Sequence, residues 1–416
     1  MNTLHCLDLF TGIGGFHLAA QRNGHIKTIC TSEIDTYNVA FIDRNLGLDN
    51  AGDVSNVAVP LSMHPDTSYA EQDLVAVEET GFTTLSLEDF MEGVLPWPDI
   101  VCGGFPCQDI SAANTLGNHA GINGERSGLV TEQLRIIEDL EPRYVVMENS
   151  DQLPKRGLAN ILAELNRLGY QVEWETVSAV HYGYPHYRHR TYLVAYLTDS
   201  AIAQQNKRVF DVVRRRANKK PDHRFPLLNR AGADIIEMAT VENPRSIKLR
   251  TKRINSLGNA IIPDIALAIF DAITEAENKT KYPVPAQGST SLHRDEQYHA
   301  SLIQQHWQRI QTCLFDDNTD VDCIPSRGLM REGHIYTGPV DRKLNPTKTT
   351  YENMYSTLIS RDGNNNFTTK SRLNRPGKLG GLIGDLMRLG ANKGGLSPIF
   401  AERFMGYPDN YTALKE

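Results

Sequence analysis

The stretch that decides the fold is DLFTGIGGFHLAA, residues 8–20 of the 416-residue chain. A short apolar run at residues 4–10 leads into its three glycines, and a helical pattern that ends near Gly24 follows them. The next residues, HIKTICTSEID (25–35), have the pattern of a second strand and end in acidic side chains. Strand, glycine turn, helix and strand in this order predict the opening of a parallel α/β sheet.

Glycines in a turn between a strand and a helix allow a ligand to approach the backbone closely. Here Gly12, Gly14 and Gly15 lack the last glycine of the G-x-G-x-x-G dinucleotide fingerprint. Asp8 before the turn suits a ligand with an amino or other positive group, and Glu33 would accept hydrogen bonds from ribose hydroxyls. S-adenosylmethionine satisfies both acids, although any α/β protein can carry a glycine turn at this point.

Further polar clusters follow predicted strands, which is where open α/β sheets place their chemistry. The loop GGFPCQDIS puts Cys107 after an apolar strand. Glu148 and Asn149 follow the apolar run RYVVM, and Arg188 and Arg190 follow the turn GYPHY. A surface ion pair would explain each polar cluster singly, but together they indicate a thiol, a carboxylic acid and arginines at one sheet edge.

This combination resembles the DNA (cytosine-5)-methyltransferases, whose ordered motifs it matches over residues 4–273. DLFTGIGGF is similar to their first motif, SEID to the second and AGDV (51–54) to the third. GGFPCQDIS looks like their nucleophile loop, ENS like the motif that supplies an acid, and LGNAIIP like the last motif. The resemblance implies a class I S-adenosylmethionine-dependent methyltransferase fold, which is α/β and Rossmann-like with a mixed, mostly parallel sheet, plus a smaller irregular DNA-recognition region.

The resemblance and the two acids together predict the binding site of the methyl donor, S-adenosyl-L-methionine. Glu33 would contact the ribose, and Ile34 and Asp53 would lie near the adenine. The full set of expected donor-binding residues is Asp8, Phe10, Gly12, Gly14, Glu33, Ile34, Asp53 and Asn259.

The same resemblance assigns the chemistry to Cys107, Glu148, Arg188 and Arg190. A Cys107 thiolate would add to C6 of cytosine, which makes C5 nucleophilic enough to accept a methyl group. Glu148, in a dry pocket that raises its pKa, would donate a proton or hydrogen bond at N3. Arg190 would stabilise charge at O2, and Arg188 would order Glu148 or the loop. The target nucleotide would have to be flipped out of the duplex.

Two features depart from the family's pattern. His186 stands where the family has the first residue of its Gln-x-Arg-x-Arg motif, while both arginines are kept. The segment LSPIFAERFMGYPDNYT (396–412) resembles a motif that the family usually places before LGNA, but here it follows. We therefore expect target recognition to lie at least partly in residues 301–395.

These patterns predict a division of the chain into three parts. A catalytic domain would cover residues 1–273, with an irregular insertion at 58–88 and a short variable segment at 197–250. A linker would cover residues 274–300. A target-recognition region would cover residues 301–416 and end in the displaced motif.

The net charge of −7 does not by itself favour nucleic acid, but basic residues are concentrated locally. Residues 207–224 carry eight Lys and Arg against two acids. Residues 341–378 carry eight against three, with Tyr351, Tyr355 and Phe367 among them. We expect both segments to contact phosphates of double-stranded DNA, although a solvated helix and a polar loop would have the same composition.

The composition also limits the class of protein. No run approaches the roughly 18 apolar residues that a membrane helix needs, and the six scattered cysteines form no zinc or disulfide pattern. We expect an intracellular, cytoplasmic protein of a bacterial or phage-infected cell that acts as a monomer, without a metal and without a membrane. It would work either beside a cognate restriction endonuclease, in restriction-modification, or alone.

Three other functions stay open at this stage. An RNA cytosine-5 methyltransferase would use the same fold, with the aromatic residues near 351–367 accepting single-stranded RNA. A catalytically silent DNA-binding protein would not need the intact Cys107, Glu148 and Arg190. A nicotinamide-dependent dehydrogenase is disfavoured by Asp8 and by the missing third glycine.

Overall fold

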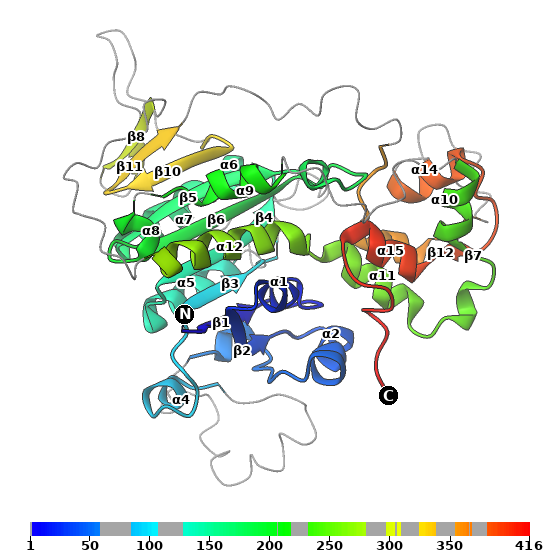
Figure 1. Cartoon of the computed structure of the whole chain (residues 1–416), viewed down its shortest axis with the longest axis horizontal. Helices are drawn as coiled ribbons and strands as arrows, with labels where there is room; N and C mark the ends of the chain where they lie inside the picture. The colour runs from blue at the N-terminus through cyan, green and yellow to red at the C-terminus, as the bar shows by residue number, and fades with distance from the viewer. Residues whose placement is uncertain are drawn as a thin grey trace.

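The computed structural model describes residues 2–58, 85–106, 128–205, 207–217, 232–279, 297–303, 306–308, 324–337, 354–365, 367 and 381–416. Among them, one 10-stranded sheet runs through the molecule, and helices cover both of its faces (Figure 1). The mixed α/β architecture expected from the sequence is confirmed. The insertion expected at residues 58–88 lies mostly outside the described residues.

One half of the sheet is parallel, and it is built from buried, nearly continuous apolar strands. In spatial order its strands are β2 (Ile26–Ser32), β1 (Leu4–Leu9), β3 (Ile100–Gly103) and β4 (Tyr144–Ser150). All seven residues of β4 are buried, as expected for a strand covered on both faces. Because these strands are parallel, their carboxyl ends meet at one edge, which is where a ligand site is expected.

The other half of the sheet is antiparallel. The strand β6 lies between β4 and β5 and is antiparallel to both. In spatial order the strands of this half are β6 (Arg190–Leu197), β5 (Tyr170–Val177), β10 (Arg327–Arg331), β11 (His334–Thr337), β8 (Gln297–Ile303) and β9 (His306–Gln308).

Two layers of helices enclose the sheet, and each covers its own apolar core. The first layer packs on one face and comprises α1 (Gly15–Asn23), α8 (Ala201–Gln204), α9 (Val209–Ala217) and α12 (Pro263–Lys279). The second layer packs on the other face and comprises α4 (Leu87–Met91), α5 (Leu129–Leu140), α6 (Leu153–Arg156) and α7 (Leu158–Arg167). The short helix α2 (Thr36–Phe41) follows β2 and continues into a π-helical turn, Ile42–Leu46.

A smaller group of helices lies beside the parallel half of the sheet, on the right of Figure 1. It comprises α10 (Gly232–Ala239), α11 (Arg250–Asn259), α14 (Gly381–Arg388), α15 (Pro398–Met405) and the two-stranded sheet of β7 (Thr240–Val241) and β12 (Gly395–Leu396). No single helix in the described parts of the chain is long and apolar enough to cross a membrane. The pair α11 and α12, bent by 45° at the break between them, would be long and apolar enough by length and composition only.

Two features of the described structure cross the boundaries of the expected three-part division. Strand β10, from the region expected to recognise DNA, pairs with β5 of the catalytic sheet. Helix α12 extends to Lys279, into the segment expected to be a linker. Hydrogen bonding across the sheet therefore joins segments that the sequence pattern separated.

The displaced segment 396–412 is anchored by a buried ion pair. The guanidinium of Arg253, on α11, donates to the carboxylate of Glu402, on α15, at 2.8 Å, and the Glu402 side chain is 0% exposed. The same carboxylate accepts from the backbone N–H groups of Asn410 and Thr412 at 2.7 and 2.9 Å. Buried charges are tolerated only with such complete pairing, so the two helices depend on each other.

We predict that Arg253→Met lowers the free energy of unfolding by about 3–5 kcal/mol, because it leaves a buried carboxylate without its cation. Urea unfolding measures the change. The matched control is Arg403→Met, which breaks the exposed pair between Arg403 and Asp409 and should cost at most about 1 kcal/mol. Equal losses in the two variants would contradict the anchoring role of the buried pair.

Candidate active site

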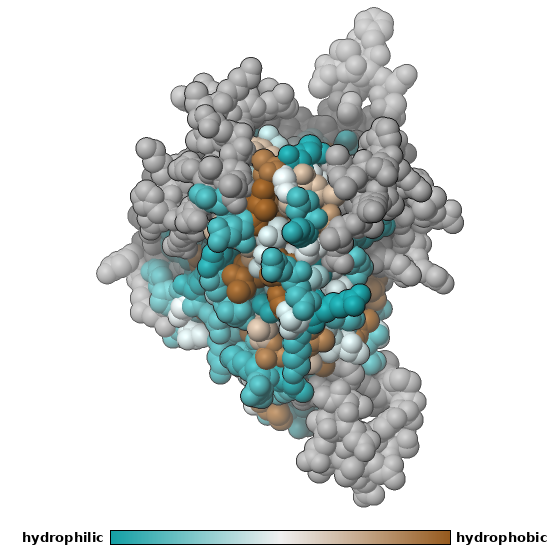
Figure 2. All heavy atoms as spheres, turned by 90° about the vertical axis from the view of Figure 1, so that its right-hand side faces the viewer, coloured by the Kyte–Doolittle hydropathy of each residue, from teal (hydrophilic) through white to brown (hydrophobic). Residues whose placement is uncertain are grey.

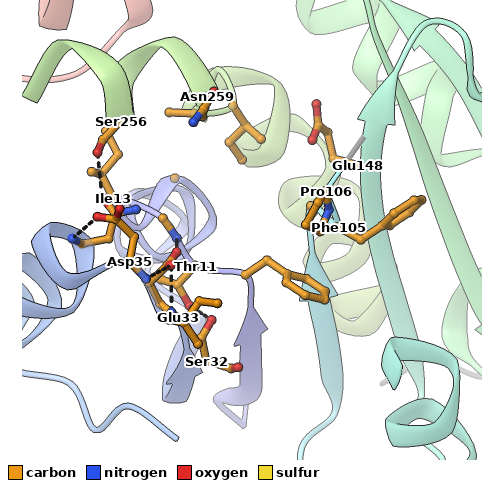
Figure 3. A pocket seen from close by; sticks show the side chains of 18 of the residues that line it. Thr11, Ile13, Ser32, Glu33, Asp35, Phe105, Pro106, Glu148, Ser256 and Asn259 are labelled. Carbon is orange, nitrogen blue, oxygen red and sulfur yellow. Dashed lines mark hydrogen bonds between the residues drawn. The ribbon is translucent and has the colours of Figure 1, made fainter. Parts of the chain in front are cut away.

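A cavity of about 510 Å³ lies at the carboxyl ends of the four parallel strands. Residues that directly follow or end β1, β2, β3 and β4 line it, and α11 closes it from the side. In Figure 3, Glu148, Phe105 and Pro106 lie on one side of the cavity, Thr11, Ile13, Ser32, Glu33 and Asp35 lie on the other, and Ser256 and Asn259 reach in from α11.

The glycine turn after β1 has an unusual backbone that shapes one wall of the cavity. Phe10, Gly12 and Gly14 have φ of 54°, 57° and 70°, in the left-handed region. Phe10 is strained there because it carries a side chain, and such strain concentrates at functional sites. At Gly15 a Cβ would lie 2.5 Å from Ile261 and 2.8 Å from the Tyr407 hydroxyl, so only glycine fits.

The acid at the end of β2 is held by the turn it faces. One carboxylate oxygen of Glu33 accepts from the N–H of Gly12 at 2.7 Å, and the other accepts from the N–H groups of Ile34 and Asp35 at 2.8 Å. Burial raises the pKa of Glu33, and these hydrogen bonds oppose the rise. The neighbouring Ile34 is 62% exposed and lines the cavity, so it offers an apolar surface to a ligand.

The structure brings most of the expected donor-binding residues together. The residues of that set that line the cavity are Phe10, Gly12, Glu33, Ile34, Asp53 and Asn259. Gly14 and Asp8 do not line it; Gly14 shapes the turn as the residue before α1. The expectation that Asp8 contacts a positive group of the ligand is therefore not supported by its placement.

Asp8 is instead enclosed in the core beneath the turn. Its side chain is 1% exposed, one oxygen accepts from the Cys102 thiol at 3.5 Å, and the other has no hydrogen-bond partner among the described residues. Burial raises the pKa of Asp8 to about 8, and the charge of Glu33 adds to the rise. The carboxyl group therefore stays largely protonated near neutral pH, and it serves packing rather than charge recognition.

Cys107 lies outside the described residues, but the chain reaches the cavity directly before it. Gly104, Phe105 and Pro106 all line the cavity. The side-chain amide of Asn149, at the end of β4, donates to the carbonyl oxygen of Phe105 at 3.0 Å. Asn149 therefore fixes the backbone two residues before Cys107, which explains why an amide follows the acid in the sequence Glu148-Asn149.

Glu148 and Arg190 form a pair inside the cavity. The Nε of Arg190 lies 3.0 Å from a carboxylate oxygen of Glu148, and both residues line the cavity. Glu148 is buried, and burial raises its pKa; the charges of Arg190 and then Arg188 oppose the rise. Carboxyl groups with a perturbed pKa of this kind, buried in a cavity beside a cation, are typical of functional sites.

Arg188 binds the backbone rather than the acid. It donates to the carbonyl oxygens of Leu358 and Gly258 at 3.0 Å each and to that of Ala260. Burial lowers the pKa of Arg188, but these acceptors match its charged form. The side chain therefore joins the end of α11 to the segment before the 3₁₀ helix η9 (Ser360–Asn364). Close contact needs Gly258, where a Cβ would lie 2.2 Å from the nitrogen of Ser360.

His186, which replaces the family's glutamine, contacts the displaced segment. Its Nε2 lies 2.9 Å from the carbonyl oxygen of Phe404, and its ring stacks on the Phe404 ring with centroids 4.4 Å apart. A nitrogen that faces a carbonyl oxygen must carry the hydrogen. Burial lowers the pKa of His186 to about 3, so the ring is neutral and joins the loop of both arginines to α15.

The basic segments expected to bind phosphates are only partly described, and two arginines of the first segment are engaged internally. On α9, Arg214 pairs with Glu175 and Asp211, and Arg216 pairs with Asp271 and Glu275.

In the second basic segment the described aromatic residues are not available for stacking on bases. Tyr355 is 6% exposed and Phe367 is 1% exposed, and both belong to the apolar core. The placement of these two rings removes part of the argument for a single-stranded RNA substrate.

Sequence reasoning missed several residues that line the cavity. They come from the turn itself, from α11 and from η9, and they are Thr11, Ile13, Lys252, Asn255, Ser256 and Ser360. The motif LGNA marked the end of α11, but nothing local indicated that the preceding turns of the helix face the cavity too. Among the described residues, no group of three or more His, Cys, Asp and Glu side chains could hold a metal ion.

The sheet order, the glycine turn and the acid at the end of β2 are features of class I S-adenosylmethionine-dependent methyltransferases. Within that class, the model of the family described as C-5 cytosine-specific DNA methylase matches residues 82–416. The match covers more than half of the chain and includes the cluster around Glu148 and the displaced segment. The chain belongs to this family.

Named relatives are similar over about half of the chain. The type II methyltransferase M.Sau3AI of Staphylococcus aureus is 29% identical over 208 residues, which cover 48% of this chain and 45% of that protein. M.HhaI of Haemophilus parahaemolyticus is 27% identical over 203 residues, which cover 48% and 51%. The chain thus spans about half the length of the curated relatives it matches. Among solved structures, S. pombe Dnmt2 methyltransferase matches 62% of this chain and 67% of its own, with 18% identity and a TM-score of 0.39.

The buried Asp8 carboxyl predicts a stability that changes with pH. Its pKa is raised from 3.8 to about 8 in the folded chain, so between these values the folded state keeps a proton that the unfolded state has released. Stability must then fall as pH rises through this window. Asp8→Asn removes this contribution, so the variant should gain stability over the wild type progressively from about pH 4 to pH 8.

Denaturant unfolding at a series of pH values measures this difference, and titration with S-adenosylmethionine measures donor affinity in the same variant. An unchanged pH slope would mean that Asp8 is ionised in the core. A loss of donor affinity in a variant that still folds would mean that Asp8 contributes to donor binding.

Proposed function

We propose that the chain transfers a methyl group from S-adenosylmethionine to C5 of cytosine within a specific sequence of duplex DNA. The observation that carries the proposal is the buried Glu148, with a raised pKa and paired with Arg190, in the same cavity as the glycine turn and Glu33. A donor site and a proton donor facing one space are what methyl transfer to a weakly nucleophilic ring requires.

The residues on the β1 and β2 side fit the methyl donor, which supplies an electrophilic methyl group when bound. Glu33 has lone pairs left for ribose hydroxyls, since each oxygen accepts only one or two backbone N–H groups. The exposed Ile34 can pack on the adenine, and Asp53 lies at the same wall. Phe10, Gly12 and Asn259 would surround the rest of the donor. The volume of about 510 Å³ is in the range of small-molecule sites.

In the proposed reaction the thiolate of Cys107 adds to C6 of cytosine, and a carbon–sulfur bond forms. The electron pair of the C5–C6 bond becomes available at C5, which would then take the methyl group as the methyl–sulfur bond of the donor breaks and S-adenosylhomocysteine leaves. Loss of the C5 proton and departure of the thiolate from C6 restore the aromatic ring and the free cysteine. The support from the geometry is that Phe105 and Pro106 bring the chain to the cavity directly before Cys107.

Glu148 and Arg190 would manage the charge that this addition creates. Negative charge develops toward N3 and O2 of the ring as the thiolate adds. A protonated Glu148 would donate to N3, and Arg190 would stabilise O2 and keep the carboxyl group in position. Arg188 would act indirectly, because its guanidinium holds the backbone at Gly258 and Leu358.

Duplex DNA is the proposed substrate, and the target nucleotide would be flipped into the cavity, because the ring is out of reach inside the base stack. The type II names of the relatives support a role in restriction-modification, in a bacterial cell or a phage-infected host, with a cognate endonuclease as the partner. The direct experiment uses labelled S-adenosylmethionine and unmethylated duplex DNA, followed by bisulfite sequencing. Label confined to cytosines of one short motif is expected; label in transfer RNA instead would favour the RNA enzyme.

We predict that Cys107→Ser abolishes methyl transfer, because a serine hydroxyl is a far weaker nucleophile than a thiolate toward C6. Donor affinity should stay at the wild-type value, since the donor half of the cavity is untouched. Filter binding of labelled methyl groups to DNA measures turnover, and calorimetry measures donor binding. A fully active serine variant would exclude the covalent mechanism.

We predict that Glu148→Gln slows methyl transfer by roughly 10²–10⁴-fold, the usual contribution of a general acid, and weakens DNA binding far less. Because burial raises the pKa of Glu148, the wild-type rate should fall with rising pH where this group loses its proton, above the ordinary range of a carboxyl group. The variant should lack that limb of the pH–rate profile. Persistence of the limb in Glu148→Gln would assign it to another group.

A further inference from the structure

A groove of about 530 Å³ lies next to the candidate active site, between residues 244–252 and residues 363–364. Lys252 lines both the groove and the main cavity, so the two spaces adjoin at this side chain. The groove lies on the side of the molecule that carries α10, α11 and α15, and hydrophilic residues make up much of the coloured surface there (Figure 2). A polymer with one base in the cavity would extend along this groove.

The loop that forms the groove carries exposed cations. Arg245, Lys248 and Lys252 are all exposed, and in the described parts of the chain none of them forms an ion pair with a carboxylate. Glu242 is the acid exposed at the start of this loop. Elsewhere on the surface, arginines such as Arg135 are paired with acids. Their position sets these three cations apart: Arg245 and Lys252 line the groove beside the cavity, and Lys248 lies between them in the chain.

The loop is held rigidly from inside. The guanidinium of Arg250 is buried and donates to the carbonyl oxygens of Leu396 at 2.8 Å and Gly363 at 3.2 Å. It joins the loop to β12 and to η9, and Gly363 and Asn364 of η9 line the groove opposite the loop. Leu249, the residue before α11, has φ of 54°, so the surrounding contacts must hold its backbone in place. A preorganised cationic surface loses little conformational entropy when it binds.

The basic run at residues 207–224 is less suited to the same task. Arg214 and Arg216, in its described part, already pair with Glu175 and Asp271. Phosphates would have to displace these internal carboxylates, whereas phosphates at the groove would meet cations that have no such partners in the described structure. The charge arrangement thus favours the groove, which the sequence did not single out.

We propose that Arg245, Lys248 and Lys252 form a rim that binds phosphates of duplex DNA beside the flipped nucleotide. The inference rests on the proposed function and extends it by naming the surface that holds the backbone. Each cation on a phosphate releases condensed counterions, so such contacts make affinity depend on salt and position the duplex without reading its sequence.

The test is the salt dependence of binding by the full chain to a fluorescent duplex DNA of mixed sequence, measured by anisotropy between about 50 and 200 mM salt. The double variant Arg245→Ala/Lys248→Ala leaves Lys252 and the main cavity intact. Two lost phosphate contacts should make the slope of log K, where K is the DNA association constant, against log salt concentration less negative by about 2, since each contact contributes about 0.9. S-adenosylmethionine affinity and the thermal midpoint should match the wild type.

The matched control is Lys27→Ala/Arg215→Ala, which removes two exposed cations from β2 and from the basic run on α9. Its slope should equal that of the wild type. If the groove variant keeps the wild-type slope while the wild type binds and methylates DNA, the rim is refuted and the proposed function stands. If the wild type binds no duplex DNA, or transfer RNA displaces the duplex at equal concentration, both proposals fail.

Discussion

The ion pair between Arg253 and Glu402 is the contact on which the rest of this structure depends. It joins α11, which lines the active-site cavity, to α15, which follows it by more than a hundred residues. The chain beyond α15 then reaches the glycine turn, where the Tyr411 hydroxyl donates to the carbonyl oxygen of Ile13 at 3.0 Å. The displaced motif thereby supports the proposed donor site from outside, although it comes last in the chain.

Burial explains why two acids in one sheet have different roles. Asp8 and Glu148 are both removed from water, and this raises the pKa of each. Asp8 lies beneath the turn against the Cys102 thiol and does not line the cavity. Glu148 faces the cavity and pairs with Arg190, which places its carboxyl group where a substrate could reach it. The same direction of pKa change thus accompanies packing in one place and, in the proposed reaction, chemistry in the other.

Some basic side chains of the protein pair with carboxylates of the fold, and others face solvent. The runs that stand out in the sequence by their density of arginine are engaged, at least on α9, with carboxylates of β5 and α12. Arg245, Lys248 and Lys252 are less visible in the sequence as a basic cluster, yet they face solvent beside the active-site cavity. Density of basic residues is therefore a poor guide to where a polyanion binds, because only the fold decides which cations already have acids beside them.

The sequence by itself determined the strand, turn and helix order, and it predicted that Glu148, Arg190 and most of the expected donor-binding residues would share one site. These features are local, since apolar runs, glycine turns and polar residues at strand ends can each be recognised within a short stretch of sequence. Only the tertiary structure decided the burial of Asp8, the return of residues 396–412 to α11, and the joining of β10 to the catalytic sheet. Each of these depends on contacts between segments far apart in the chain, and no local pattern encodes which distant partner a strand, an acid or a helix will meet.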